Sequence, residues 1–225
     1  MIRGLIFDMD GLLIDSERIV QRSWAAAGRD LGYPDIGEQI YHTIGFNRAR
    51  RTAFFSSVYG KDFPHEAFAA ATRERFRAIV AEEGMALKPG ARALIDYAKA
   101  RGYRLAVATS SSQAYATRSL QSAGVYDAFD GFVFGNMVAH SKPDPEIYRR
   151  AVAAVSLEPP QCIALEDAPS GIASACAAGL KAIMIPDLVQ PDDETRSMAW
   201  KVYPSLARVI PLLQCLGAQQ HPLDG

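Results

Sequence analysis

Two aspartates near the N-terminus are the first candidates for chemistry. Asp8 and Asp10 are separated by one residue and are followed by Gly11, directly after the apolar segment 5–7. Carboxylates at the end of a strand could take part in catalysis or in metal binding. Asp and Gly are also common in turns, so this short segment taken alone is more typical of a solvated turn.

A second pair of carboxylates, Glu166 and Asp167, follows the apolar run of residues 162–165. Two adjacent carboxylates at the end of an apolar strand are costly to bring together unless a cation neutralises them. The pair therefore favours a metal site over a solvated loop.

Hydroxyl residues and one lysine follow other apolar runs. Residues 109–112 read Thr-Ser-Ser-Ser, and hydroxyls with backbone N–H groups at a strand-to-helix junction can hold phosphate oxygens. Ser111 or Ser112 could also serve as a helix N-cap, and both interpretations can hold together. Lys142 lies in a segment stiffened by two prolines, which could aim its charge at a site. It could instead be an ordinary surface lysine.

The elements that must position these residues alternate along the chain. Short apolar runs that end in polar residues are typical of buried parallel strands. The helical patterns between them, several followed by a stop-signal glycine, predict crossover helices. The predicted strands cover residues 5–7, 103–109, 131–134, 162–165 and 181–185, and the helices cover residues 91–101, 112–123, 145–155 and 170–178.

This alternation predicts an α/β fold with a Rossmann-like, doubly wound parallel sheet. In such a sheet, ligands bind outside the carboxyl ends of the strands. The candidate residues come directly after the predicted strands or before a crossover helix. The sequence therefore predicts that they share one edge of the sheet.

An insertion interrupts the alternation. Residues 16–84 contain helical periodicity and turns but no convincing strand, with helices predicted over residues 16–31 and 65–82. We expect two domains, an α/β core formed by residues 1–15 and 85–225 and an inserted all-helical cap formed by residues 16–84. The cap is expected to cover the carboxyl edge of the sheet.

The composition argues against several classes of protein. The 225 residues include 24 Lys plus Arg and 25 Asp plus Glu, and this formal net charge of -1 argues against a nucleic-acid partner. No apolar run approaches the roughly 20 residues of a membrane span, so we expect a soluble, cytoplasmic protein without a membrane partner. The three cysteines are far apart and predict neither a disulfide framework nor a zinc site.

The order of the candidate segments resembles the four sequence motifs of the haloacid dehalogenase-like superfamily. The segments that carry the resemblance span nearly the whole chain. The position of the helical insertion is similar to that in the subgroup containing phosphoglycolate phosphatases and β-phosphoglucomutases. The matching segments are residues 8–17, 108–110, 142–145 and 165–172.

The resemblance implies a role for each matching residue. Asp8 would attack phosphorus to form an aspartyl phosphate, and Asp10 would protonate the leaving oxygen and then activate water. Thr109 and Ser110 would bind the transferring phosphoryl group. Lys142 would neutralise charge between that group and Asp8.

The resemblance also implies Mg²⁺ as the cofactor. Its ligands would be an oxygen of Asp8, the backbone carbonyl of Asp10, Asp167 and Glu166, since Mg²⁺ favours octahedral sites built from oxygen. Relatives that act on carbon centres lack an acid at the position of Asp10. Asp10 therefore favours phosphate esters over haloacids as substrates.

Two positions in the insertion bear on the substrate. Residues 45–48 resemble a loop by which some relatives reach the distal part of the substrate. Arg48 is therefore a candidate for binding a second anionic group, and the alternative is a solvated arginine beside Arg50 and Arg51. β-Phosphoglucomutases carry a histidine at the position of Val20. Valine cannot make the histidine's hydrogen bond, which favours simple hydrolysis.

We therefore expect a Mg²⁺-dependent phosphatase that hydrolyses a small phosphate monoester, such as a sugar phosphate, through an aspartyl-phosphate intermediate. The α/β domain would be the phosphotransferase core, and the cap would control substrate access. The alternatives are a β-phosphoglucomutase-type transferase and a non-catalytic phosphate-binding module. The sequence identifies neither the ester nor the oligomeric state, and a monomer is compatible with it.

Overall fold

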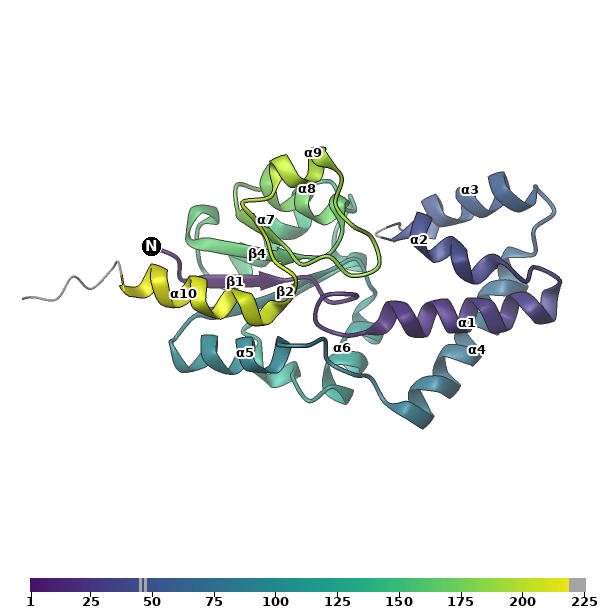
Figure 1. Cartoon of the computed structure of the whole chain (residues 1–225), viewed down its shortest axis with the longest axis horizontal. Helices are drawn as coiled ribbons and strands as arrows, with labels where there is room; N and C mark the ends of the chain where they lie inside the picture. Colours follow the sequence, from purple (N-terminus) through teal and green to yellow (C-terminus); the bar gives the residue numbers. More distant parts are fainter. Residues whose placement is uncertain (45, 47, 219–225) are drawn as a thin grey trace, which may run out of the picture. The chain divides into compact units, whose positions relative to one another are not determined.

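The computed structural model of the chain describes residues 1–44, 46 and 48–218 (Figure 1). It divides into two compact units, which are treated separately below. Met1–Ile14 and Leu87–Gly225 form the core unit, and Asp15–Ala86 form the helical unit.

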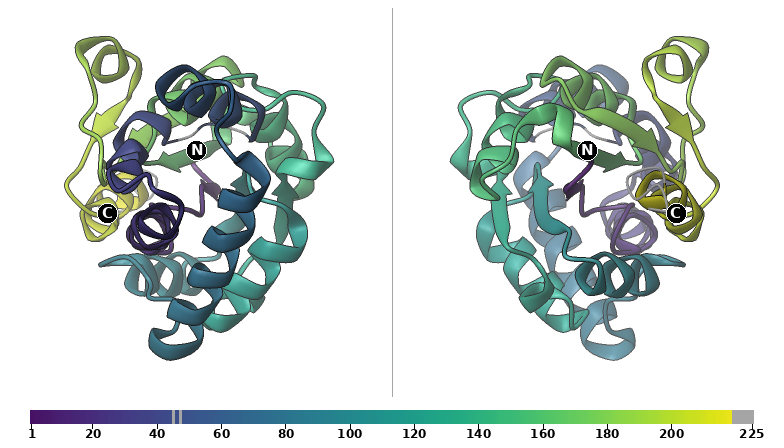
Figure 2. Two further views of the ribbon diagram at one scale, coloured as in Figure 1. Left: turned by 90° about the vertical axis from the view of Figure 1, so that its right-hand side faces the viewer. Right: turned by 90° about the vertical axis from the view of Figure 1, so that its left-hand side faces the viewer.

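A parallel sheet forms the centre of the core unit. Its strand order is β3-β2-β1-β4-β5-β6, and every pairing is parallel. Figure 2 shows β6, in yellow-green, at one edge of the sheet. The strands are β1 (Gly4–Phe7), β2 (Arg104–Thr109), β3 (Gly131–Phe134), β4 (Cys162–Glu166), β5 (Lys181–Met184) and β6 (Lys201–Val202).

The register aligns the carboxyl ends of the three central strands. Phe7, the last residue of β1, pairs with Val107 of β2 on one side and with Leu165 of β4 on the other. The chain adds β2 and β3 on one side of β1 and then crosses to β4 on the other side, so the strand order reverses beside β1. This is the place where ligands bind in open α/β sheets.

Helices cover both faces of the sheet. Figure 1 shows α7 and α8 on one side of it and α5 and α10 on the other. Side chains of α7 and α8, including Tyr148 and Ile172, form a buried cluster with Ile6 and Ala164 of the sheet. The helices of the core unit are α5 (Ala91–Ala100), α6 (Gln113–Ser122), α7 (Glu146–Ala154), α8 (Pro169–Ala177), α9 (Asp193–Met198) and α10 (Val209–Ala218).

The helical unit contains no strand among its described residues. Its core is aromatic: the ring of Phe55 lies 5.2 Å from that of Trp24, 5.4 Å from that of Phe63 and 5.5 Å from that of Phe68 between centroids. Such edge and tilted contacts add to the area that large rings bury. The helices are α1 (Ser16–Leu31), α2 (Ile40–Thr43), α3 (Arg48–Tyr59) and α4 (His65–Glu83).

The predicted fold class, a Rossmann-like doubly wound parallel sheet with an inserted all-helical unit, is confirmed. The sequence did not predict strand β6 or the helices α2, α3, α9 and α10. Strand β6 has two residues at the sheet edge, and neither is buried. Helix α3 buries Phe55 alone, so its apolar periodicity is weak. Among the described residues, no helix combines the length and apolar character needed to span a bilayer.

Candidate active site

The turn after β1 positions Asp8 and Asp10. The backbone N–H of Asp8 still donates to the carbonyl of Leu165 on β4 at 3.0 Å, which holds Asp8 at the end of the sheet. Gly11 has a φ of 82°, which glycine adopts at little cost. Its N–H donates to the carbonyl of Ile14 at 3.0 Å. The segment that carries Asp8 and Asp10 is therefore a turn, and it lies at the edge of the sheet where the sequence predicts the site.

Lys142, in the loop before α7, is buried, and the alternative of a surface lysine is wrong. Its Nζ donates to Asp8 Oδ1 at 2.5 Å, to Glu166 Oε1 at 2.5 Å and to the carbonyl of Ala108 at 3.0 Å. A lysine ammonium has three N–H donors, so these acceptors use all of them. Lys142 thus connects the carboxyl ends of β1, β2 and β4.

Glu166 is buried and accepts hydrogen bonds on both oxygens. In addition to Lys142, the hydroxyl of Tyr148 donates to Oε1 at 2.6 Å, and the backbone N–H groups of Asp167 and Ala168 donate to Oε2 at 3.2 and 3.3 Å. A Cβ atom at Gly171 would lie 1.9 Å from the Glu166 carboxyl carbon. Helix α8 can approach this carboxylate only because residue 171 is glycine.

Three carboxylates gather beside Lys142. Oxygen atoms of Asp8, Glu166 and Asp167 lie within 4.8 Å of one another, and all three residues are buried. We call these residues, together with Lys142, the inner cluster. One ammonium does not balance three carboxylates, and an all-oxygen donor set suits Mg²⁺. The residues therefore fit the predicted cofactor.

Burial and neighbouring charges shift the pKa values of Asp8 and Lys142. Burial raises the pKa of Asp8 to about 7, and the charge of Glu166 adds to this shift while Lys142 opposes it. Burial alone would lower the pKa of Lys142, but the charges of Asp8 and Glu166 outweigh that effect and raise it. Lys142 therefore stays cationic, while Asp8 needs further positive charge to be fully ionised near neutral pH.

The carboxylate of Asp10 contacts the segment that follows β2. Ser111 Oγ donates to Asp10 Oδ2 at 2.7 Å, and the hydroxyl of Tyr115 donates to Oδ1 at 3.1 Å. Sequence reasoning treated Ser111 only as a possible phosphate ligand or helix cap, and it missed Tyr115 and Tyr148. Both tyrosines lie on helices, where nothing in the sequence distinguishes them from packing residues.

Thr109 and Ser110 lie where β2 ends. Thr109 is 1% exposed, and its Oγ1 accepts a hydrogen bond from the backbone N–H of Ser111 at 3.0 Å. Ser110 is exposed. A Cβ atom at Gly135 would lie 2.1 Å from the carbonyl oxygen of Ser110, so glycine at 135 permits the close approach of the two loops.

Arg48 belongs to the helical unit. It begins α3, and its Nη2 forms an ion pair with Glu66 Oε1 at 2.8 Å; the two side chains are 79% and 80% exposed. The predicted substrate loop includes Gly45 and Asn47, which lie outside the described residues. Substrate binding by Arg48 stays a prediction.

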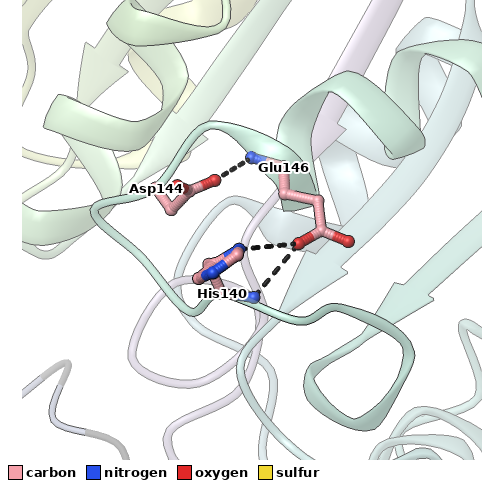
Figure 3. Close-up of side chains that lie close together, drawn as sticks. All are labelled: His140, Asp144 and Glu146. Atoms are coloured by element: carbon pink, nitrogen blue, oxygen red, sulfur yellow. Dashed lines mark hydrogen bonds and ion pairs between the residues drawn. The ribbon is translucent and has the colours of Figure 1, made fainter.

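A second acidic group, which we call the outer cluster, lies at the start of α7 (Figure 3) and comprises His140, Asp144 and Glu146. Glu146 Oε2 accepts hydrogen bonds from the backbone N–H groups of Ala139 and His140 at 2.9 and 3.1 Å. Asp144 Oδ1 accepts one from the N–H of Glu146 at 2.9 Å. The hydrogen bond from the His140 N–H contributes most to lowering the pKa of Glu146.

Known proteins are similar to this chain in sequence and in fold. Residues 2–179 match the haloacid dehalogenase-like hydrolase family. CbbY of Cereibacter sphaeroides is 34% identical over 203 residues, which cover 86% of this chain and 88% of that protein. Hexitol phosphatase A of Escherichia coli strain K12 is 34% identical over 185 residues, covering 81% of this chain and 82% of that protein.

A solved structure is also similar to this chain over most of its length. The crystal structure of CbbY from Rhodobacter sphaeroides in complex with phosphate superimposes with a TM-score of 0.79 at 31% identity, covering 93% of this chain and 96% of that chain. The predicted enzyme class, a phosphatase of the haloacid dehalogenase-like type, is thereby confirmed. The chain belongs to the haloacid dehalogenase-like hydrolase family.

Proposed function

We propose that this chain is a Mg²⁺-dependent phosphatase that hydrolyses a small phosphate monoester, with Asp8 as the nucleophile. The observation that carries the proposal is the buried contact of 2.5 Å between Asp8 Oδ1 and Lys142 Nζ in the inner cluster. A charged nucleophile, a fixed cation and a group of oxygen ligands at one sheet edge are what phosphoryl transfer needs.

The inner cluster supplies the proposed metal ligands. Asp8 and Asp167 would hold Mg²⁺ together with the backbone carbonyl of Asp10. Of the three carboxylates, Glu166 is the least available as a metal ligand, because both its oxygens already accept hydrogen bonds from protein groups. When bound, Mg²⁺ neutralises the charge of the carboxylates and of the phosphoryl oxygens.

The reaction proceeds in two steps. In the first, a carboxylate oxygen of Asp8 attacks phosphorus, the bond to the ester oxygen breaks, and Asp10 gives its proton to the departing oxygen. In the second, water attacks phosphorus and its proton passes to Asp10, while the bond between phosphorus and Asp8 breaks, which releases phosphate and restores the Asp8 carboxylate. Thr109 and Ser110 bind the phosphoryl oxygens in both steps, and the charge of Lys142 offsets the negative charge of that group and of Asp8.

Sugar phosphates and sugar-alcohol phosphates are the substrate class we propose. Hexitol phosphatase A is named for a sugar-alcohol phosphate, and its similarity to this chain covers most of both proteins. We propose that the helical unit acts as a cap that controls substrate access, and that Arg48 binds a second anionic group of the substrate. Val20 in α1 has no hydrogen-bonding side chain, which supports hydrolysis over return of the phosphoryl group.

A panel of phosphate esters tests this function. The panel contains glycolate, hexitol, hexose, pentose and nucleotide phosphates with Mg²⁺, and phosphate release is measured for the unsubstituted protein, Asp8→Asn and Asp144→Asn. Asp144→Asn is the matched control, because it makes the same chemical change in the outer cluster. We expect release by the unsubstituted protein and by Asp144→Asn only. Equal release by Asp8→Asn would contradict the proposal, and isomer conversion exceeding phosphate release would instead support a transferase.

A further inference from the structure

Two hydroxyl groups fix the carboxylate of Asp10. Ser111 Oγ donates to one of its oxygens at 2.7 Å, and the Tyr115 hydroxyl donates to the other at 3.1 Å. The χ2 torsion of an aspartate has broad minima, so the side chain alone sets the direction of its carboxylate plane only weakly. Donors on both oxygens restrict that rotation, which a donor on one oxygen would leave freer.

The two donors are themselves attached to the sheet and to a neighbouring loop. The N–H of Ser111 donates to Thr109 Oγ1 at 3.0 Å, and its carbonyl accepts from the N–H of Gly135 at 2.8 Å. At the start of α6, the N–H of Gln113 donates to Asn136 Oδ1 at 2.9 Å. Hydrogen bonds to Thr109, Gly135 and Asn136 therefore fix the segment that carries the hydroxyls of Ser111 and Tyr115.

We propose that Ser111 and Tyr115 are positioning residues that aim Asp10 at the leaving oxygen of the substrate. This inference rests on the proposed function, because the direction of Asp10 matters only if it transfers a proton. In the first step the bond between phosphorus and the ester oxygen breaks, and the proton moves from Asp10 to that oxygen. The protons of Ser111 and Tyr115 remain on their own oxygens, so neither residue is consumed or oxidised.

The effect of positioning Asp10 should depend on the leaving group of the ester, which distinguishes it from a general loss of activity. An alkoxide needs the proton that Asp10 supplies, whereas p-nitrophenolate is a weak base and can leave without it. A misaimed Asp10 therefore slows the cleavage of an alkyl phosphate more than that of p-nitrophenyl phosphate. The ratio kcat/KM includes only steps up to release of the alcohol, so it excludes the later attack of water.

The test compares Tyr115→Phe with the unsubstituted protein on p-nitrophenyl phosphate and on an alkyl phosphate from the panel. We expect kcat/KM for the alkyl phosphate to fall about tenfold, the factor that corresponds to one hydrogen bond. For p-nitrophenyl phosphate we expect a change below about twofold. Ser111→Ala should show the same pattern. Equal losses on both esters, or no loss on the alkyl phosphate, would overturn the inference.

Tyr126→Phe is the matched control. Tyr126 is half-buried like Tyr115, and its ring stacks on Phe132 with centroids 4.6 Å apart. Loss of its hydroxyl should leave kcat/KM for both esters unchanged. A leaving-group-dependent loss in this variant would contradict an assignment specific to Tyr115.

A double substitution tests whether Tyr115 acts through Asp10. In the Asp10→Asn background, Tyr115→Phe should lower kcat/KM no further, because the group that it positions is already gone. Independent losses that multiply would overturn the inference. If the unsubstituted protein releases no phosphate from any ester, the proposed function fails and this inference fails with it. If the protein is active but the variants do not discriminate between esters, the inference alone fails.

Discussion

The inner and outer clusters contain similar acidic residues, but their carboxylates contact different groups. In the inner cluster, Asp8 and Glu166 share the ammonium of Lys142 in a buried site. In the outer cluster, Glu146 accepts hydrogen bonds from backbone N–H groups and pairs with Arg150 Nη1 at 3.3 Å. The loop before α7 connects the two, since it carries both Lys142 and His140.

The difference shows why proximity of carboxylates alone does not identify a metal site. In the outer cluster the surrounding chain satisfies the charge of Glu146, and its pKa is lowered. In the inner cluster, three buried carboxylates lie beside one ammonium, and burial raises the pKa of Asp8 to about 7. Only the inner cluster gains electrostatically from a cation, because the outer one already has its donors.

Removing the cation that pairs with the carboxylates of each cluster should give the largest difference in stability between the two clusters. Lys142→Met leaves two buried carboxylates without their ammonium, so we expect a loss of about 3 kcal/mol in the free energy of unfolding. Arg150→Met is the control, and we expect a loss below about 1 kcal/mol because this pair is half-exposed. Urea denaturation measures both. Similar losses in the two variants would remove the distinction between the clusters.

Magnesium should stabilise the protein through the inner cluster. With free Mg²⁺ at a hundred times its dissociation constant, the free energy of unfolding should rise by about 2.7 kcal/mol. Thermal denaturation with and without Mg²⁺ should show this rise in Asp144→Asn and little of it in Asp167→Asn. The reverse pattern would place the metal in the outer cluster.

A smaller effect should follow from removing one neutral donor of the inner cluster. Tyr148→Phe takes from Glu166 a buried hydrogen bond of 2.6 Å, so we expect a loss of about 1 to 2 kcal/mol in the free energy of unfolding. Tyr126→Phe should change it by less than about 0.5 kcal/mol. Chemical denaturation of both variants checks this. An equal change in both would mean that the Tyr148 hydroxyl contributes nothing specific.

The smallest effect concerns the pH dependence of the outer cluster. Because the pKa of Glu146 is lowered on folding, its contribution to stability is fully present above its ordinary value of 4.5 and is lost as the pH falls through the folded-state pKa. The urea midpoint of the unsubstituted protein should therefore exceed that of Glu146→Gln near neutral pH and converge with it in acid. A difference that grows on acidification would contradict the assigned sign.

Much of the core and of the inner cluster could be predicted from the sequence. Apolar runs marked five strands of the sheet, and the polar residues after them marked its functional edge. The convergence of Asp8 and Asp167 followed from parallel topology, which brings the carboxyl ends of strands together.

Other features needed three-dimensional information. Tyr115 and Tyr148 contact carboxylates from distant segments, across 105 and 18 residues, and tyrosine on a helix usually indicates packing. The burial of Lys142 depends on how its loop folds back onto β1 and β4, which no local pattern encodes. The role of Arg48 depends on a substrate that the sequence does not identify.

Trapping the covalent intermediate tests the central claim, that Asp8 accepts the phosphoryl group. The protein is mixed with Mg²⁺ and its best ester, quenched during turnover and treated with borohydride, which reduces an acyl phosphate to an alcohol. Mass spectrometry of the peptide that contains residue 8 should then find homoserine in place of Asp8, and only when the ester was present. Rapid phosphate release with residue 8 recovered entirely as aspartate, under conditions that reduce a synthetic acyl phosphate, would contradict the account.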